Sequence, residues 1–320
     1  MLADFEASDL SFASRVAAAS RALVLGIGGG GDAVGSIAVA RALEDRGLAT
    51  VLGGVAWERI VVDPHPGPRA VTDIRGGRVL DGAVIVDPAE GATTPEDVHF
   101  CESRLASHLG ERTVLIDVTA GPAGAARGIA SACAELDCDL AVLVDIGGDA
   151  IAAGAEPGLA SPLCDAVMIA AGARAGVPCL LAVLGAGCDG ELEPAEVLGR
   201  VATLARTEAW LDTLGVAPAA AAEIEAAGAV AVTEASLLVA RAARGEIGPV
   251  EIRGGRRTVE LGPAAALAFI FDLDASLSEL PLAQAVADAP SIAAARDTLN
   301  NLGISTELDW EERRAFPPPD

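Results

Sequence analysis

Residues 22–36 read ALVLGIGGGGDAVGS, and this stretch decides the fold. The apolar run 22–25 predicts a short buried strand, and the glycines of 26–31 predict a tight turn. A helical pattern follows over residues 32–46 and leads into a second apolar strand at 49–53. A strand, a glycine-rich turn, a helix and a second strand in this order open a doubly wound α/β fold.

The alternation of strands and helices continues to about residue 211. Further strands are predicted at 79–86, 113–117, 140–144 and 177–184, and helices at 95–109, from 121, at 161–175 and at 194–211. A lead-in helix is expected over residues 1–19. Because strands and helices alternate, residues 1–211 are expected to form a Rossmann-like core, a doubly wound and mostly parallel sheet with helices on both faces.

Residues 212–320 have a different pattern. Two alanine-rich helices are expected near 219–225 and 234–244, and a hairpin of strands 249–253 and 257–261 across Gly254-Gly255. An apolar segment at 265–271, a helix near 291–300 and an acidic tail ending in Pro-Pro-Pro-Asp complete the chain. We expect an appended α+β subdomain over 212–320, packed on the core.

Composition and charge exclude several classes of protein. The chain of 320 residues is 52% hydrophobic and has a formal net charge of −24, and a surface so acidic repels nucleic acid. The sequence contains no uninterrupted apolar run of the length that a membrane helix needs. Its first residues lack the basic segment that begins a secretory signal peptide. We therefore expect a cytoplasmic protein without nucleic-acid or membrane partners, and base rates favour a homo-oligomer.

The cysteines and histidines do not indicate a zinc site. None of the six cysteines forms a CxxC pair, and the three histidines are scattered along the chain. A disulfide framework is not expected in a cytoplasmic chain of this size.

The loop after the strand 140–144 carries the strongest sign of a functional site. Residues 145–165 read DIGGDAIAAGAEPGLASPLCD, with acidic side chains at Asp145, Asp149 and Glu156. Ser161 is expected to cap a helix whose first residue is Pro162. Long irregular loops usually have a function, so we interpret this one as an active-site loop at the carboxyl edge of the sheet. The alternative is a plain connection with solvated acids.

Acidic residues follow most of the predicted strands. These ends carry Asp32, Asp87, Asp117 with Thr119, Asp145 with Asp149, and Asp189 with Glu191. Carboxylates brought together at one edge repel each other or recruit a hard cation such as Mg²⁺ or Mn²⁺. We predict that Asp145, Asp149 and Glu156 hold the metal and perform general acid–base catalysis. The alternative for Asp32 and Asp189 is ordinary helix capping.

The glycine-rich turn has the spacing Gly26-x-Gly28-x-x-Gly31 of a phosphate-binding loop. A dinucleotide fold also needs an acidic residue at the end of the second strand to hold the ribose. Here that strand ends in Gly53-Gly54, and the nearest acid, Glu58, lies beyond Trp57. NAD is therefore disfavoured as a cofactor.

The predicted ligand-binding set combines these elements with one arginine. Arg69 follows a Pro-Gly-Pro loop and is a candidate clamp for a carboxylate or phosphate, with an ordinary surface arginine as the alternative. The full set is Gly28, Gly29, Gly30, Gly31, Asp32, Arg69, Thr119, Gly147, Gly148, Ser161 and Asp189.

Several motifs together resemble one known family. They are Gly26-Ile-Gly-Gly-Gly-Gly-Asp32, Trp57-Glu-Arg59 with Pro66-Gly-Pro-Arg69, Asp145-Ile-Gly-Gly-Asp149, Ser161-Pro162 with Asp165, Asp189-Gly-Glu-Leu192 and Thr306-Glu-Leu-Asp-Trp310. The combination resembles the archaeal and bacterial domain-of-unknown-function family 1152 over nearly the whole chain. That family implies no established activity or catalytic residues.

A more distant similarity is to D-glutamate cyclase-like lyases, which carry an Asp-Gly-Gly-Asn/Asp loop. In Asp145-Ile-Gly-Gly-Asp149 an isoleucine is inserted and the following acid is missing. This resemblance would imply addition or removal of water at a small carboxylate substrate.

The sequence leaves three functional interpretations. The first is a metal-assisted hydrolase or lyase that acts on a small anionic metabolite, either phosphorylated, nucleotide-like or a carboxylate. The second is an NAD(P)- or nucleotide-binding protein or oxidoreductase that uses the glycine-rich turn. The third is a non-catalytic scaffold whose acidic residues only cap helices.

Overall fold

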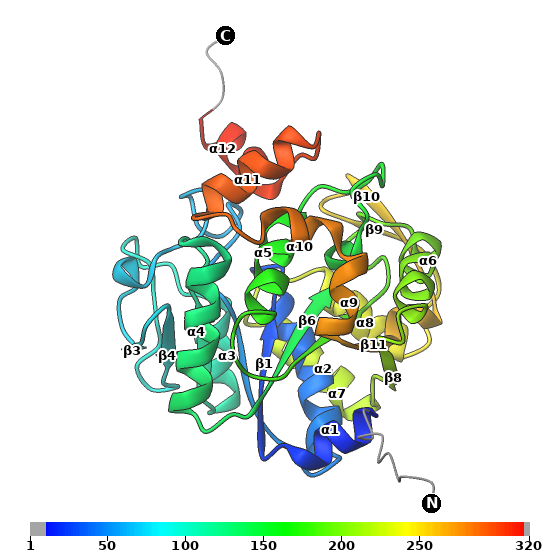
Figure 1. Cartoon of the computed structure of the whole chain (residues 1–320), viewed down its shortest axis with the longest axis horizontal. Coiled ribbons are helices and arrows are strands. Elements are labelled where there is room, and N and C mark those ends of the chain that lie inside the picture. Colours follow the sequence, from blue (N-terminus) through cyan, green and yellow to red (C-terminus); the bar gives the residue numbers. More distant parts are fainter. Residues whose placement is uncertain (1–10, 317–320) are drawn as a thin grey trace, which may run out of the picture.

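The computed structural model describes residues 11–316 and has a nine-stranded sheet between two layers of helices (Figure 1). Its middle strands run parallel in the order β5-β2-β1-β6-β7. They are β1 (Arg21–Gly26), β2 (Ala49–Val55), β5 (Thr113–Ile116), β6 (Leu140–Ile146) and β7 (Cys179–Leu184). From β1 the chain first builds outward through β2 and β5, and then returns to the other side of β1 and builds outward through β6 and β7. This is the strand order of a Rossmann fold. The predicted α/β fold with a mostly parallel sheet is confirmed.

Antiparallel strands extend the sheet at both edges. β4 (Ala83–Val86) pairs with β5 and with β3 (Arg78–Val79), while β11 (Leu267–Asp272) lies between β7 and β8 (Trp210–Gly215). The predicted helix 194–211 is too long, because α6 (Pro194–Ala205) ends early and residues 210–215 pair with β11. The predicted boundary at residue 211 thus falls inside β8, and the C-terminal part of the chain completes the same sheet.

Alternate residues of the central strands face opposite layers. Leu23 and Leu25 enter one core, and Ala22 and Val24 enter the other. The first core also contains side chains of α4 (Gly121–Glu135), α5 (Pro162–Gly172), α6, α10 (Pro281–Val286), α11 (Ile292–Asn301) and α12 (Glu307–Ala315). The second contains side chains of α1 (Phe12–Ala18), α2 (Asp32–Glu44), α3 (Cys101–Leu109), α7 (Pro218–Gly228) and α8 (Ala235–Ala243). Burial on both faces explains why the strands are continuous apolar runs.

The remaining elements mostly agree with the sequence analysis. The predicted hairpin is present as β9 (Gly248–Ile252) and β10 (Arg257–Leu261), and the three later helices as α7, α8 and α11. Short elements are η1 (Val71–Asp73), η2 (Asp149–Ile151), η3 (Pro263–Ala266), α9 (Leu273–Ser276) and η4 (Leu277–Glu279). The lead-in helix is present as α1, and the remainder of that prediction over 1–10, like the tail 317–320, lies outside the described residues. Within residues 11–316, none of the helices combines the length and apolar character needed to cross a bilayer.

One buried carboxylate anchors the last helix. The Glu311 side chain on α12 is fully buried, and its Oε2 accepts hydrogen bonds from Trp57 Nε1 at 3.0 Å and Gly67 N at 2.9 Å. Because Trp57 lies two residues after the end of β2, these bonds tie the C-terminal helix to the carboxyl edge of the sheet.

Replacing Glu311 with alanine is expected to lower the free energy of unfolding by about 2–4 kcal/mol, since each buried donor left without an acceptor costs about 1–3 kcal/mol. Urea unfolding measures this change. The control is Glu312→Ala on the same helix, which breaks an ion pair with Arg296 that is partly open to solvent and is expected to cost less than about 1 kcal/mol. Equal effects of the two substitutions would contradict the anchoring role.

Candidate functional site

Three carboxylates meet where the strand order reverses between β1 and β6. Asp32 opens α2 after β1, Asp145 lies near the end of β6, and Asp165 lies in the first turn of α5. One carboxylate oxygen of each lies within 4.8 Å of the other two. These residues form the first triad, at the position where open α/β sheets bind their ligands.

Three further carboxylates form a second triad. Asp149 opens the short helix η2, while Asp189 and Glu191 lie in the loop after β7. One oxygen of each again lies within 4.8 Å of the others. We call the two triads together the acidic centre. The segment at and just after the end of β6 contributes one residue to each triad, Asp145 to the first and Asp149 to the second.

Two glycines make room for these carboxylates. A Cβ on Gly28 would lie 2.4 Å from Oδ2 of Asp32, and one on Gly147 would lie 2.4 Å from Cγ of Asp189. Gly147 also has a φ of +136°, which side chains rarely allow. Only glycine therefore fits at these two positions while the carboxylates stay in place.

Neither Asp32 nor Asp189 caps a helix. Gly31 is the N-cap of α2, and the Asp32 carboxylate instead accepts a hydrogen bond from Gly28 N at 3.0 Å. Glu193 is the N-cap of α6, and Asp189 accepts from Glu191 N at 3.1 Å. Helix capping therefore does not account for either carboxylate.

Several oxygens of the acidic centre are buried without a partner. Asp145 and Asp165 are each 1% exposed and Asp189 is 6% exposed. Among the described residues, no group meets hydrogen-bond geometry with either oxygen of Asp145, with Asp165 Oδ1 or with Asp189 Oδ2, although Gly148 N–H and Asp149 lie near enough to Asp145 to lower its pKa. Buried polar atoms without partners are costly, so these oxygens call for a proton or a cation.

Burial and mutual repulsion raise the pKa values of these groups. Burial is the larger cause for each, and it raises the pKa of Asp32 to about 7 and that of Asp189 to about 8. The pKa values of Asp145, Asp149 and Asp165 are raised well above their ordinary value by burial and then by neighbouring carboxylates. The centre therefore retains protons near neutral pH unless a cation replaces them.

Glu191 is the most firmly held member of the second triad. Its Oε2 accepts hydrogen bonds from Ala160 N at 2.7 Å and Ser161 N at 2.8 Å. Its Oε1 accepts from Ser161 Oγ at 2.6 Å and from Arg257 Nη1 at 3.1 Å. Ser161 is the N-cap residue of α5 and Pro162 its first residue, as predicted, but the Ser161 side chain makes no capping bond. Its hydroxyl donates to Glu191, while Glu307 accepts from the first N–H groups of α5.

Arg59 lies between the glycine-rich loop and α12. Its guanidinium donates to the carbonyl of Gly28, lies 4.9 Å from the centre of the Trp57 ring, and has Glu307 at 3.7 Å. Its charge lowers the pKa of Asp32 and of Asp165 against the effect of burial. Arg59 is thus a cation that the protein itself supplies beside the first triad.

The predicted glycine loop is already packed against this segment. Gly30 N donates to the carbonyl of Trp57 at 2.9 Å, and a Cβ on Gly30 would lie 3.3 Å from Cγ of Arg59. Gly29 has a φ of +77°, and Gly31 lies against Thr233. Gly148 leaves room for the side chain of Val197 on α6. These glycines therefore have packing roles in the structure.

The structure places Glu156 outside both triads. Its carboxylate is half-buried and accepts hydrogen bonds from Ala153 N and Gly154 N, both at 2.8 Å. These bonds close a local turn of its own loop. Glu191, rather than Glu156, stands with Asp149 in the acidic centre.

Arg69 and Thr119 have structural partners as well. The Arg69 guanidinium donates to both oxygens of Asp63, at 2.7 and 2.8 Å, and to Glu96 at 2.8 Å. Thr119 donates to Asp117 through its hydroxyl and its backbone N–H. The structure does not bring either residue into the acidic centre, and a ligand would have to compete with buried ion pairs for Arg69.

Sequence reasoning missed four residues of the site, namely Asp165, Glu191, Arg59 and Arg257. Two of these residues could have been found from the sequence. Asp165 lies in the first turn of the helix predicted after Ser161-Pro162, and Glu191 lies two residues after Asp189 at the end of a predicted strand. Nothing local points to Arg257, which reaches the loop after β7 from the distant hairpin.

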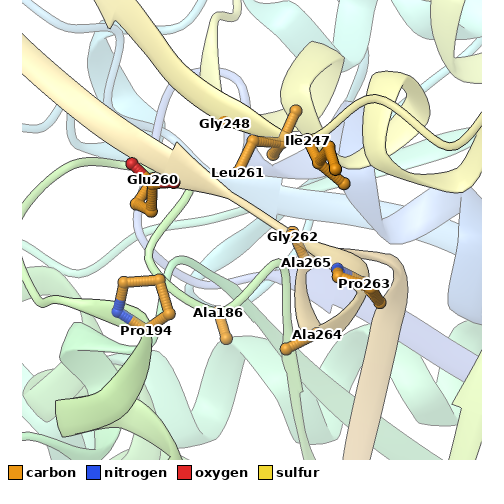
Figure 2. Close-up of a pocket in the computed structure, with 10 residues that line it drawn as sticks. All are labelled: Ala186, Pro194, Ile247, Gly248, Glu260, Leu261, Gly262, Pro263, Ala264 and Ala265. Atoms are coloured by element: carbon orange, nitrogen blue, oxygen red, sulfur yellow. The ribbon is translucent and has the colours of Figure 1, made fainter.

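An open hollow near the acidic centre is a separate feature. Figure 2 shows that Pro194 and Ala186 line it from one side and Ile247 and Leu261 from the hairpin side. Its volume is about 440 Å³, and its single charged lining residue is Glu260. Because none of the six carboxylates lines it, the hollow does not open into the acidic centre.

A Rossmann-ordered sheet with a buried acidic centre at its switch point defines the chain as an α/β protein with a site typical of ligand-binding members of that class. The chain belongs to the family described as "Protein of unknown function (DUF1152)", whose family model matches residues 23–315. No curated protein and no solved structure matches the chain. The resemblance to family 1152 is confirmed, and the comparisons give no support to the similarity with D-glutamate cyclase-like lyases.

The raised pKa values predict how stability depends on pH. Between the ordinary aspartate pKa near 4 and about 8, folded Asp189 binds more protons than the unfolded chain does. In chelator-treated protein the free energy of unfolding is therefore expected to fall as pH rises from 5 to 8. Urea unfolding across this range measures the slope.

The variant Asp189→Asn is expected to make that slope shallower, because it removes one of the protons that the folded state retains. Glu156→Gln is the matched control, since Glu156 lies outside both triads, and it should keep the wild-type slope. Stability that rises with pH in the chelated wild-type protein would contradict the electrostatic description of the centre.

Proposed function

We propose that the protein binds a divalent cation, Mg²⁺ or Mn²⁺, at the first triad and acts as a hydrolase or lyase on a small anionic metabolite. The observation that carries this proposal is Asp145, which is 1% exposed with both carboxylate oxygens unpartnered among the described residues. A buried carboxylate without hydrogen bonds is costly unless it is protonated or a cation binds it, and a cation is the alternative that we propose.

The donor set supports a hard cation. Asp32, Asp145 and Asp165 offer only carboxylate oxygens, which Mg²⁺ and Mn²⁺ prefer. Cys164 is a neighbour of Asp165 in the chain, but burial raises the pKa of its thiol well above the ordinary value and so disfavours the thiolate that zinc needs. The triad is therefore better suited to an oxygen-binding metal.

The chemistry follows from the residues around the triad. A bound cation would neutralise charge on an anionic substrate and polarise one of its oxygens. Asp149, whose pKa is raised by burial and by Asp165, holds a proton beside the first triad as long as no cation replaces that proton. Ser161 Oγ lies 3.4 Å from Asp149 Oδ2, while its single proton goes to Glu191 at 2.6 Å.

The alternative of an NAD(P)- or nucleotide-binding protein has less support. The N–H groups of Gly28 and Gly30 already donate to Asp32 and to Trp57, so two donors of the phosphate-type loop are engaged. Glu58, the acid nearest to the end of β2, accepts a hydrogen bond from Cys101 N at the start of α3. The phosphate position therefore has fewer N–H groups to offer, and the acid nearest the ribose position already has a partner.

Thermal unfolding of chelator-treated protein tests the proposal. Mg²⁺ or Mn²⁺ at about 100 times its dissociation constant is expected to stabilise the wild-type protein by about 2.7 kcal/mol. Asp165→Asn should show a clearly smaller shift, because it removes one ligand of the first triad, whereas Glu156→Gln should retain the wild-type shift.

The same experiment includes arms with NAD, NADP and ATP. A shift with a nucleotide and none with a metal would favour the alternative function. No shift with either metal in the wild-type protein, or an equal shift in Asp165→Asn, would contradict a cation site at the first triad.

A further inference from the structure

The second triad has the features of a cation site in its own right. Asp149, Asp189 and Glu191 are each at most 6% exposed, and their oxygens lie within 4.8 Å of one another. Asp189 Oδ2 is buried and has no hydrogen-bond partner in the part of the chain that the structure describes. An acidic cluster alone would be weak evidence, but this unpartnered oxygen points to a missing positive charge.

The second triad is also held in place by its surroundings. Arg257 on the hairpin donates to the carbonyl of Asp189 and to Glu191 Oε1, both at 3.1 Å. Ser161 fixes Glu191 from the α5 side through its N–H and its hydroxyl. Two segments distant in sequence therefore converge to orient these carboxylates, which is the preorganisation that a binding site needs.

The two triads are joined by one short stretch of backbone. Asp145 at the end of β6 belongs to the first triad, and Asp149 at the start of η2 belongs to the second. Ser161 Oγ approaches Asp149 as well as Glu191, so the α5 start contacts the second triad while Asp165 on the same helix serves the first. Ions at the two triads would therefore be neighbours.

We propose that the second triad binds a second divalent cation, so that the acidic centre is a two-cation site for a phosphorylated substrate. This inference deepens the proposed function and rests on it for the first cation. Paired cations about 3.5–4 Å apart are typical of sites that clamp phosphate oxygens, and their combined charge suits a doubly negative phosphate group.

Equilibrium dialysis of the full chain with Mn²⁺, followed by electron paramagnetic resonance, tests the inference. The wild-type protein is expected to bind two Mn²⁺ per chain with a spin-coupled signal. Asp189→Asn should bind one Mn²⁺ with an uncoupled signal, and Glu156→Gln should bind two as the wild-type protein does. Inorganic phosphate should raise the melting temperature of the Mn²⁺-loaded wild-type protein and not that of loaded Asp189→Asn.

The outcomes separate the two proposals. One Mn²⁺ per chain in both the wild-type protein and Asp189→Asn would overturn the second site and leave the first-triad cation standing. No bound Mn²⁺ in the wild-type protein would overturn both. Two uncoupled ions that persist in Asp189→Asn would place the second ion elsewhere and overturn the inference.

Discussion

Six carboxylates share one buried edge of the sheet, and much of the local structure follows from accommodating them. Glycine stands at positions 28 and 147 because a Cβ there would collide with Asp32 or Asp189. Arg59 lies over the glycine loop and reaches the first triad from the β2 side, while Arg257 reaches the second from the hairpin. This concentration of like charge opposes folding, and proteins usually retain such destabilising arrangements at functional sites.

The topology of the sheet explains how residues so far apart in the chain come together. The strand order reverses between β1 and β6, so the loops that carry Asp32 and Asp149 emerge side by side. The C-terminal helix α12 then packs against the segments that carry the first triad. Glu307 on α12 accepts hydrogen bonds from the N–H groups at the start of α5, which fixes the helix that presents Asp165. The final helix is therefore a structural support of the first triad, although it contributes no residue to it.

The sequence was sufficient for the fold class and for those site residues that strand ends determine. Apolar runs and glycine turns predicted the parallel strands, and Asp145 and Asp149 were expected at the carboxyl edge because they follow one of these strands. The rest depends on tertiary contacts. Ser161 stands at the N-cap position of α5 as expected, but Glu307, distant in sequence, accepts from the first N–H groups of the helix, and the Ser161 hydroxyl donates to Glu191 instead. Glu156 was expected to be a ligand, but nearby backbone N–H groups hold it in a local turn. No sequence pattern could reveal these competing partners.

The central claim is that a divalent cation belongs between Asp32, Asp145 and Asp165. The most direct measurement is a crystal structure of the protein soaked in Mn²⁺, with anomalous scattering recorded near the manganese absorption edge. Our account predicts an anomalous peak about 2.0–2.4 Å from one oxygen of each of these three side chains, the range between short Mg²⁺–oxygen and longer Ca²⁺–oxygen bonds. A map without a peak there, in which Asp145 is instead hydrogen-bonded to ordered water, would contradict it.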